Sequence, residues 1–267
     1  MITTAMLRAM FRRIYGPTPE LPAMAGNETG LILLADGIGG FDLCGMGLRH
    51  AAGHAGLTHE VRVVNWGHGL GRWHRDLTNV ANHETQAAAI AAAALEFHES
   101  RPDAPIFLVG KSGGTGIIVK TLERLPESSV ERAVLLSSAL SPRYDLSRAL
   151  GAVRREMAVF WSPFDVFILG VGTHVFGTVD RVNTVSAGLV GFRPPASADS
   201  SQYRKLRQVR WSPQMAPTGN LGGHVGVDSP AFLRKYVVPL LLGEGGGTET
   251  TIGTSNLHIP EADSGPC

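Results

Sequence analysis

The pentapeptide Gly110–Gly114, with the sequence Gly-Lys-Ser-Gly-Gly, carries the clearest chemical signal in this chain. An apolar run over Pro105–Val109 precedes it, and a run typical of a helix, Thr115–Leu125, follows it. A strand, a tight glycine-bounded turn with a central serine and a helix form the layout of a nucleophile elbow. Small residues flank the serine because larger side chains would clash with the adjoining strand and helix. The pattern predicts that Ser112 is a nucleophile.

A nucleophilic serine needs two partners, because its hydroxyl reacts poorly at neutral pH unless a base accepts the proton and another group orients the base. Asp165 follows the second strand-like run after the serine. His224 lies in a glycine-rich loop between the last strand-like run and the last helical run. We therefore expect a Ser112–His224–Asp165 triad. Asp145, which follows the first strand-like run after the serine, is the rival for the acid.

The elements that must position these residues alternate between apolar strands and helices. Such alternation is typical of an α/β protein with a mainly parallel sheet covered by helices on both faces. The expected strands are 31–35, 60–65, 105–109, 132–137, 157–161 and 208–211; the expected helices are 43–55, 84–99, 115–125, 146–153 and 229–242. Segment 67–82 is expected to be a loop, and 170–195 receives no assignment. Binding sites in such sheets lie beyond the carboxyl ends of the strands, where the candidate residues fall.

Over residues 30–242 the chain resembles the alpha/beta-hydrolase family in the order and spacing of these features. The resemblance implies the alpha/beta-hydrolase fold. In that family the acid commonly follows the second strand after the nucleophile, and the histidine precedes the final helix. Asp165 and His224 match these two places, and Gly110, Ser112 and Gly114 match the five-residue elbow consensus.

The resemblance also implies an oxyanion hole made of two backbone amides. One donor is the residue after the nucleophile, Gly113, and the other comes from the loop after the first strand, Asp36–Gly40. Ile38 is the expected second donor, with Gly39 next. The sequence departs from the family in two places, since Asp36 stands where a histidine is common and Lys111 is an unusual neighbour for the serine.

Three regions are expected along the chain. Residues 1–25 form an amphipathic segment, residues 26–242 form the hydrolase domain, and the Gly- and Thr-rich residues 243–267 form a disordered tail. The short segment after Ser137 leaves room for one helix, so we expect little or no lid. The apolar residues near the candidate site are expected to line a substrate pocket: Phe41, Trp66, Phe164 and Phe167.

Composition narrows the functional classes. A formal net charge of +1 gives no field that would recruit nucleic acid. No apolar run reaches the roughly 20 residues of a membrane span, and Arg8, Arg12 and Arg13 interrupt the apolar start, so we expect a cytoplasmic protein. The two cysteines give no disulfide framework. The sequence leaves homo-oligomerisation open.

We expect no cofactor and no metal. A phosphate-binding loop would need a glycine where Pro105 stands. The helix that carries His50 and His54 lacks the glutamate of a zinc-protease motif, and we expect the histidines between positions 50 and 83 to lie on the surface or in loops. Asp228, next to His224, is expected to cap the last helix.

The sequence therefore predicts a serine hydrolase that cleaves carboxylic esters of a small-molecule acyl substrate through an acyl-enzyme. An amidase, thioesterase or acyltransferase with the same triad is an alternative. A binding protein that keeps the fold without catalysis is another.

Overall fold

A computed structural model describes residues 4–16, 28–69, 72–166 and 177–242. Within these ranges six strands form one sheet in the order β2-β1-β3-β4-β5-β6, and every neighbouring pair is parallel. The strands are β1 (Leu31–Ala35), β2 (Glu60–Val64), β3 (Ile106–Lys111), β4 (Val130–Leu136), β5 (Val153–Trp161) and β6 (Leu206–Arg210). This is the parallel sheet expected for the alpha/beta-hydrolase fold.

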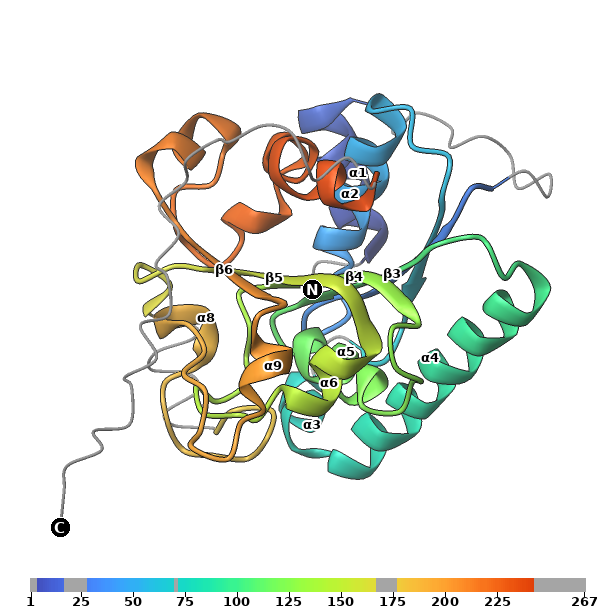
Figure 1. Ribbon diagram of the computed structural model, residues 1–267. Helices are drawn as coiled ribbons and strands as arrows, with labels where there is room; N and C mark the ends of the chain where they lie inside the picture. Colours follow the sequence, from blue (N-terminus) through green and yellow to red (C-terminus); the bar gives the residue numbers. More distant parts are fainter. Residues whose placement is uncertain (1–3, 17–27, 70–71, 167–176, 243–267) are drawn as a thin grey trace, which may run out of the picture.

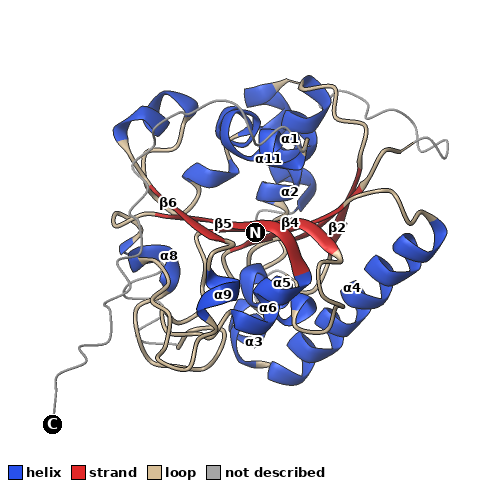
Figure 2. Ribbon diagram, in the orientation of Figure 1, coloured by secondary structure: helices blue, strands red, loops and turns tan. Residues whose placement is uncertain are grey.

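Helices cover both faces of the sheet (Figure 1). On one face lie α1 (Thr4–Tyr15), α2 (Leu43–His54), α10 (Pro230–Phe232) and α11 (Val238–Leu241). On the other lie α3 (Trp73–Thr78), α4 (Val80–Ser100), α5 (Gly114–Leu122), α6 (Ser147–Ala152), α8 (Ala187–Val190) and α9 (Ser200–Tyr203). Figure 2 shows the resulting three layers, helix, sheet and helix.

Two apolar clusters fill the spaces between these layers. One joins β1, β3 and β4 to α4, α5 and α6 and includes Leu31, Ile117 and Leu150. The other joins the opposite face of the sheet to α2 and the C-terminal helices and includes Leu48 and Phe232. Strands buried on both sides read as continuous apolar runs, and this is why β1, β3 and β4 were recognisable from sequence.

The N-terminal helix α1 packs on α2 through Leu7 and Phe11, which are buried against Met46. The segment between β4 and β5 contains the short helix α6 and a turn. No helix within the described ranges is both long and apolar enough to cross a membrane. The tail 243–267 lies outside the described residues.

Two parts of the chain differ from the sequence prediction. The expected loop 67–82 contains α3 and the start of α4, where the side chain of Asn79 accepts a hydrogen bond from the Asn82 amide at 3.1 Å and caps the helix. The expected helix 229–242 is interrupted by a π-helical turn at Leu233–Val237, just before α11. Pro239 in α11 lacks the N–H that a regular helix would bond four residues back, which accounts for the interruption.

Candidate active site

Ser112 stands in a strained turn directly after β3. Its φ angle of 52° lies in the left-handed region, and its amide donates to the Leu136 carbonyl at 2.9 Å. The helix α5 begins two residues later. A Cβ at Gly110 would lie 2.8 Å from the Thr115 Cα, and one at Gly114 would lie 2.1 Å from the Ala35 carbonyl oxygen. The elbow therefore requires glycine on both sides of the serine, and the strained backbone is typical of a functional site.

His224 lies between the serine and an aspartate. Its Nε2 is 2.9 Å from Ser112 Oγ, and its Nδ1 is 2.7 Å from Asp165 Oδ2. Both distances are those of good hydrogen bonds. Because a carboxylate can only accept, Nδ1 carries the proton toward Asp165 and Nε2 is left to accept the serine proton.

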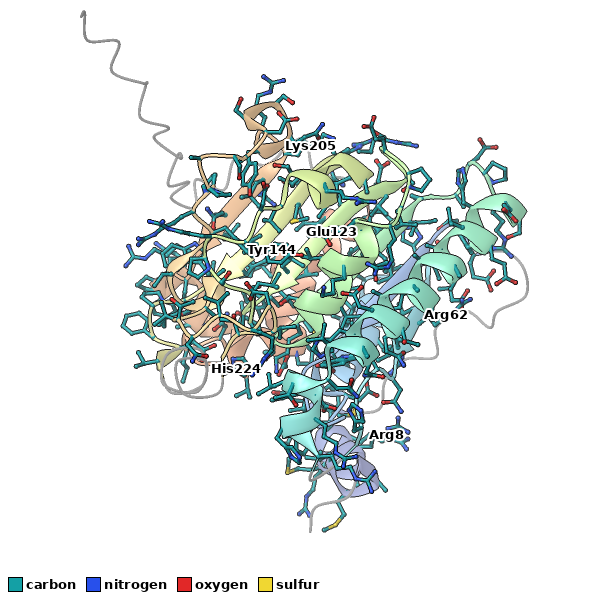
Figure 3. The ribbon with its side chains drawn as sticks, turned by 90° about the horizontal axis from the view of Figure 1, so that it is seen from below. Arg8, Arg62, Glu123, Tyr144, Lys205 and His224 are labelled. Carbon is teal, nitrogen blue, oxygen red and sulfur yellow. The ribbon has the colours of Figure 1, made fainter. Side chains whose placement is uncertain are left out.

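Three separate loops bring these side chains together at the carboxyl edge of the sheet. Ser112 follows β3, Asp165 follows β5 and His224 follows β6. Figure 3 shows His224 toward one end of the sheet and Lys205, which precedes β6, toward the opposite end. The arrangement agrees with the rule that sites of parallel sheets lie beyond the carboxyl ends of the strands.

The surroundings keep His224 neutral. Burial lowers the pKa of its imidazole, and the positive charge of Lys111 lowers it further, against the raising effect of the hydrogen bond to Asp165. Asp165 is itself buried, with 3% of its surface exposed. A neutral imidazole is the form that can accept a proton from Ser112, so the electrostatics suit a base that works near neutral pH.

Asp145, the rival acid, lies elsewhere. Its Oδ1 accepts hydrogen bonds from the amide and the hydroxyl of Ser147, at 2.9 and 2.6 Å, at the start of α6. The carboxylate hydrogen-bonded to His224 is that of Asp165. The geometry therefore favours Asp165 over Asp145 as the residue that orients the imidazole.

The residues that carry the two expected oxyanion donors, Ile38 and Gly113, are in contact. A Cβ at Gly113 would lie 2.7 Å from Ile38 Cγ2. Within the described residues neither amide has a hydrogen-bond partner, whereas the Gly39 amide donates to Asp76 Oδ2 at 2.8 Å. Gly39 is thus already engaged, so of the two candidates for the second donor, Ile38 is the one whose amide has no partner within the described residues. Asp36, in the place of the common histidine, accepts the Gly37 and Gly45 amides at 2.6 and 3.0 Å.

Lys111 and Asp228 form a buried ion pair behind the serine. Lys111 Nζ lies 3.2 Å from Asp228 Oδ2, and both side chains are buried. The expectation that Asp228 caps the last helix is therefore wrong. Its carboxylate is buried and pairs with the ammonium group of Lys111. Burial opposes the charge on Lys111, but the attraction of Asp228 and Asp36 outweighs it and raises the lysine pKa.

Asp228 is less well compensated than its partner. Burial raises the pKa of its carboxyl to about 6, despite the attraction of Lys111, and the charge of Asp36 adds to the rise. The lysine faces two carboxylates, whereas Asp228 faces one cation and a second carboxylate. The spacing of these residues in the sequence gives no sign of the pair; the unusual lysine of the elbow is the only hint.

The expected pocket residues lie in different environments. Trp66 is buried and its indole N–H donates to the Asp36 carbonyl at 2.7 Å, and its ring lies 3.3 Å from where a Gly113 Cβ would stand. Phe41 and Phe164 are exposed, at 39% and 60%. Phe167 lies outside the described residues. A cavity of about 250 Å³ lies beside the loop Asp36–Gly40. Its walls include Gly37, Gly40 and Trp66, together with the charged residues Arg8, Asp42 and Arg49.

Exposed apolar side chains flank the triad. Phe164 and Val166 stand on either side of Asp165, and Leu221 and Val225 belong to the loop of His224. Leu221 is 75% exposed and Val225 is 64% exposed. Phe164 is partly supported by Trp211, whose ring it meets nearly perpendicularly at 5.1 Å. The described segments next to Asp165 and His224 in the chain therefore present exposed apolar side chains.

The histidines between positions 50 and 83 lie in different environments. The expectation of surface positions is wrong for His50 and His83, which are buried and hydrogen-bond the carbonyls of Tyr15 and Asp76. Each carbonyl accepts a hydrogen bond from one ring nitrogen, which offsets part of the cost of burial. The other ring nitrogen of His83, Nδ1, is buried without a partner within the described residues. Within the described part of the chain, no group of three or more His, Cys, Asp or Glu side chains could hold a metal ion.

Neither a protein-family model nor a curated protein sequence matches this chain. Solved structures of similar shape include esterase PE8, at 22% identity and a TM-score of 0.46 over 82% of this chain and 97% of the other. A predicted hydrolase from Thermoplasma acidophilum matches at 14% identity and 0.45, covering 82% and 89%. A carboxylesterase from Bacillus subtilis matches at 11% and 0.41, covering 90% and 97%.

Proposed function

We propose that this protein is a serine hydrolase that cleaves carboxylic esters through an acyl-enzyme. One observation carries the proposal: the His224 imidazole bridges Ser112 Oγ at 2.9 Å and Asp165 Oδ2 at 2.7 Å. A hydroxyl on a strained turn, a neutral base and a buried carboxylate are the parts that nucleophilic acyl transfer needs.

In the first half of the reaction Ser112 Oγ attacks the ester carbonyl while His224 Nε2 takes the serine proton. The carbonyl oxygen becomes an oxyanion that accepts hydrogen bonds from the Ile38 and Gly113 amides. The tetrahedral adduct then collapses, the bond to the alkoxy group breaks, and His224 returns the proton to the leaving alcohol. The serine is left as an acyl ester.

In the second half water replaces the alcohol. His224 takes a proton from the water as its oxygen attacks the acyl carbonyl, and the second tetrahedral adduct releases the carboxylic acid when the proton passes to Ser112 Oγ. Throughout, Asp165 keeps the Nδ1 proton in place and stabilises the imidazolium. Atoms and charge balance with the ester and one water as the only reactants.

The apolar rim favours esters with an alkyl or aromatic group. Phe164, Leu221 and Val225 are exposed next to triad residues in the chain. A substrate that covers such apolar side chains is bound more tightly, because burial of apolar surface is favourable. A sugar ester would leave its hydroxyl groups facing apolar surface. We therefore infer a small acyl or aryl ester as the substrate class.

A panel of p-nitrophenyl esters, thioesters and anilides of matched acyl chains tests the proposal. We expect hydrolysis of the esters, at least tenfold slower turnover of the anilides, and no turnover by Ser112→Ala. If the protein hydrolyses only the anilides or only the thioesters, that class of acyl compound is the substrate and the ester assignment is wrong. A purified, folded protein that turns over none of them would overturn the proposal and favour a binding protein.

A further inference from the structure

Asp76 is a buried carboxylate that lies outside the triad and holds the loop after β1. Its side chain in α3 is fully buried. Oδ2 accepts the Gly39 amide at 2.8 Å, whereas Oδ1 accepts the His68 amide at 2.6 Å and lies 2.8 Å from His68 Nδ1. Three donors from two loops therefore converge on one carboxylate, which satisfies the requirement that a buried charge be hydrogen-bonded.

The surroundings of Asp76 fix the direction of these bonds. The Asn79 side-chain amide lies 3.2 Å from His68 Nε2. Since that amide can only donate to the ring, Nδ1 carries the ring proton and donates to Asp76. A Cβ at Gly67 would stand 3.0 Å from Asp76 Oδ2, so the absence of a side chain lets the loop close on the carboxylate.

A second contact holds the loop Asp36–Gly40 at Asp36, which precedes Ile38 in the chain. Trp66 donates its indole N–H to the Asp36 carbonyl at 2.7 Å, and its own carbonyl accepts from the Asn82 side chain at 2.8 Å. The two restraints, at Asp36 and at Gly39, thus flank Ile38 along the chain.

The loop needs such restraints because glycines form its tip. Gly39 and Gly40 have φ angles of 85° and 68°, in the left-handed region. Glycine loses more conformational freedom than any other residue when it is fixed, so a turn of this kind keeps one geometry only when neighbouring groups hold it. Ile38 directly precedes these two glycines in the chain.

We propose that Asp76 is a positioning residue for ester hydrolysis, and that its hydrogen bond to the Gly39 amide keeps the Ile38 amide aimed at the oxyanion. The inference rests on the proposed function. Asp76 touches no reacting atom. A fixed donor is worth more in the transition state, where the oxygen bears charge, than in the bound ester. The contribution of Asp76 therefore falls on kcat rather than on KM.

The replacement Asp76→Asn tests this role with nearly unchanged volume. Asparagine offers one oxygen to three donors, and its NH2 group must face one of the N–H groups. We expect kcat to fall about 10- to 100-fold, because small displacements of catalytic groups have effects of this size, with KM within about threefold of wild type. Affinity for an alkyl trifluoromethyl ketone, which forms a tetrahedral oxyanion on Ser112, should fall by the same factor as kcat/KM.

Gly67→Ala is a milder second variant. Its Cβ would press on Asp76 Oδ2 from 3.0 Å, and Gly67 has no positive φ that would strain an alanine. We expect kcat and ketone affinity to fall several-fold together. Asp199→Asn is the control, because that carboxylate also accepts a backbone amide, from Ser201, but at the start of α9 and away from the loop Asp36–Gly40. It should keep wild-type kinetics.

The outcomes separate this inference from the function on which it rests. Parallel losses of kcat and ketone affinity support the positioning role. If Asp76→Asn and Gly67→Ala are less stable but keep wild-type kcat and ketone affinity, the carboxylate is only structural and the inference fails while the hydrolase stands. If Asp76→Asn does not fold, Gly67→Ala decides by the same two measurements. A wild-type protein that neither cleaves esters nor binds the ketone overturns both.

Discussion

Replacement of Asp228 by asparagine should stabilise the protein at neutral pH, although it removes half of an ion pair. Asp228 is buried, and within the described residues neither of its carboxylate oxygens accepts a hydrogen bond of ordinary geometry. Lys111 Nζ, at 3.2 Å, is its counter-ion. Burial raises the pKa of Asp228 from 3.8 to about 6 against that attraction. Ionisation of Asp228 is therefore less favourable in the folded protein than in the unfolded chain, and the charged carboxylate lowers the free energy of unfolding.

The size and sign of the effect follow from proton linkage. A carboxyl whose pKa is higher in the folded state adds stability below its unfolded pKa, near 4, and that stability is lost as the pH rises through 6. About two pKa units correspond to about 3 kcal/mol at 1.36 kcal/mol per unit. Asparagine stays neutral throughout. Asp228→Asn should thus match wild type at pH 4 and exceed it by about 3 kcal/mol at pH 7.5, or about 6 °C in Tm.

Urea unfolding followed by tryptophan fluorescence at pH 4.0, 5.0, 6.0 and 7.5 measures this difference. Asp103→Asn is the matched control, since it removes the same formal charge from an exposed loop position and should leave the free energy of unfolding close to that of wild type. The reasoning is refuted if Asp228→Asn is less stable than wild type at pH 7.5 by as much as at pH 4. The attraction of Lys111 would then fully offset the cost of burial.

Three further predictions concern the triad and the elbow. Asp165→Asn should lower kcat by about 10³- to 10⁴-fold, whereas Asp145→Asn should stay within twofold; the reverse pattern would identify Asp145 as the acid. Because burial lowers the pKa of His224, kcat/KM should rise with pH and reach half its plateau below pH 6.5, and a midpoint above 6.5 would contradict the argument. Gly114→Ala should cost about 3 kcal/mol or more in thermal melts, since its Cβ would lie 2.1 Å from a carbonyl oxygen. Gly151→Ala, with nothing within 4 Å, should stabilise α6 by about 0.5–1 kcal/mol, and equal effects of the two changes would refute the steric argument.

The parts of the fold that the sequence predicted are those that local patterns determine. Continuous apolar runs identified the buried strands, and the elbow followed from glycine spacing around Ser112. The order of the strands and the residues that follow them brought Asp165 and His224 to the same edge. Sequence left Asp145 open as the acid, since both candidates follow a strand; the hydrogen bond to His224 Nδ1 distinguishes them.

The parts that the sequence missed depend on contacts between distant residues. Lys111 and Asp228 pair across more than a hundred positions, and no local spacing links them. Asp76 lies in a segment that the sequence predicts to be a loop. Nothing in the local sequence therefore indicated that its carboxylate accepts a hydrogen bond from the Gly39 amide. The π-helical turn at Leu233–Val237 could have been anticipated from Pro239, which stands inside the expected last helix.

Covalent labelling of Ser112 tests the central claim most directly. Wild-type protein is treated with an alkyl fluorophosphonate, and the modified residue is located by mass spectrometry of the intact protein and its peptides. We predict one phosphonyl group per chain, on Ser112, with labelling slowed at least a hundredfold in His224→Ala and abolished in Ser112→Ala. A folded wild-type protein that stays unmodified at Ser112, under conditions that label a known serine hydrolase completely, would contradict the account.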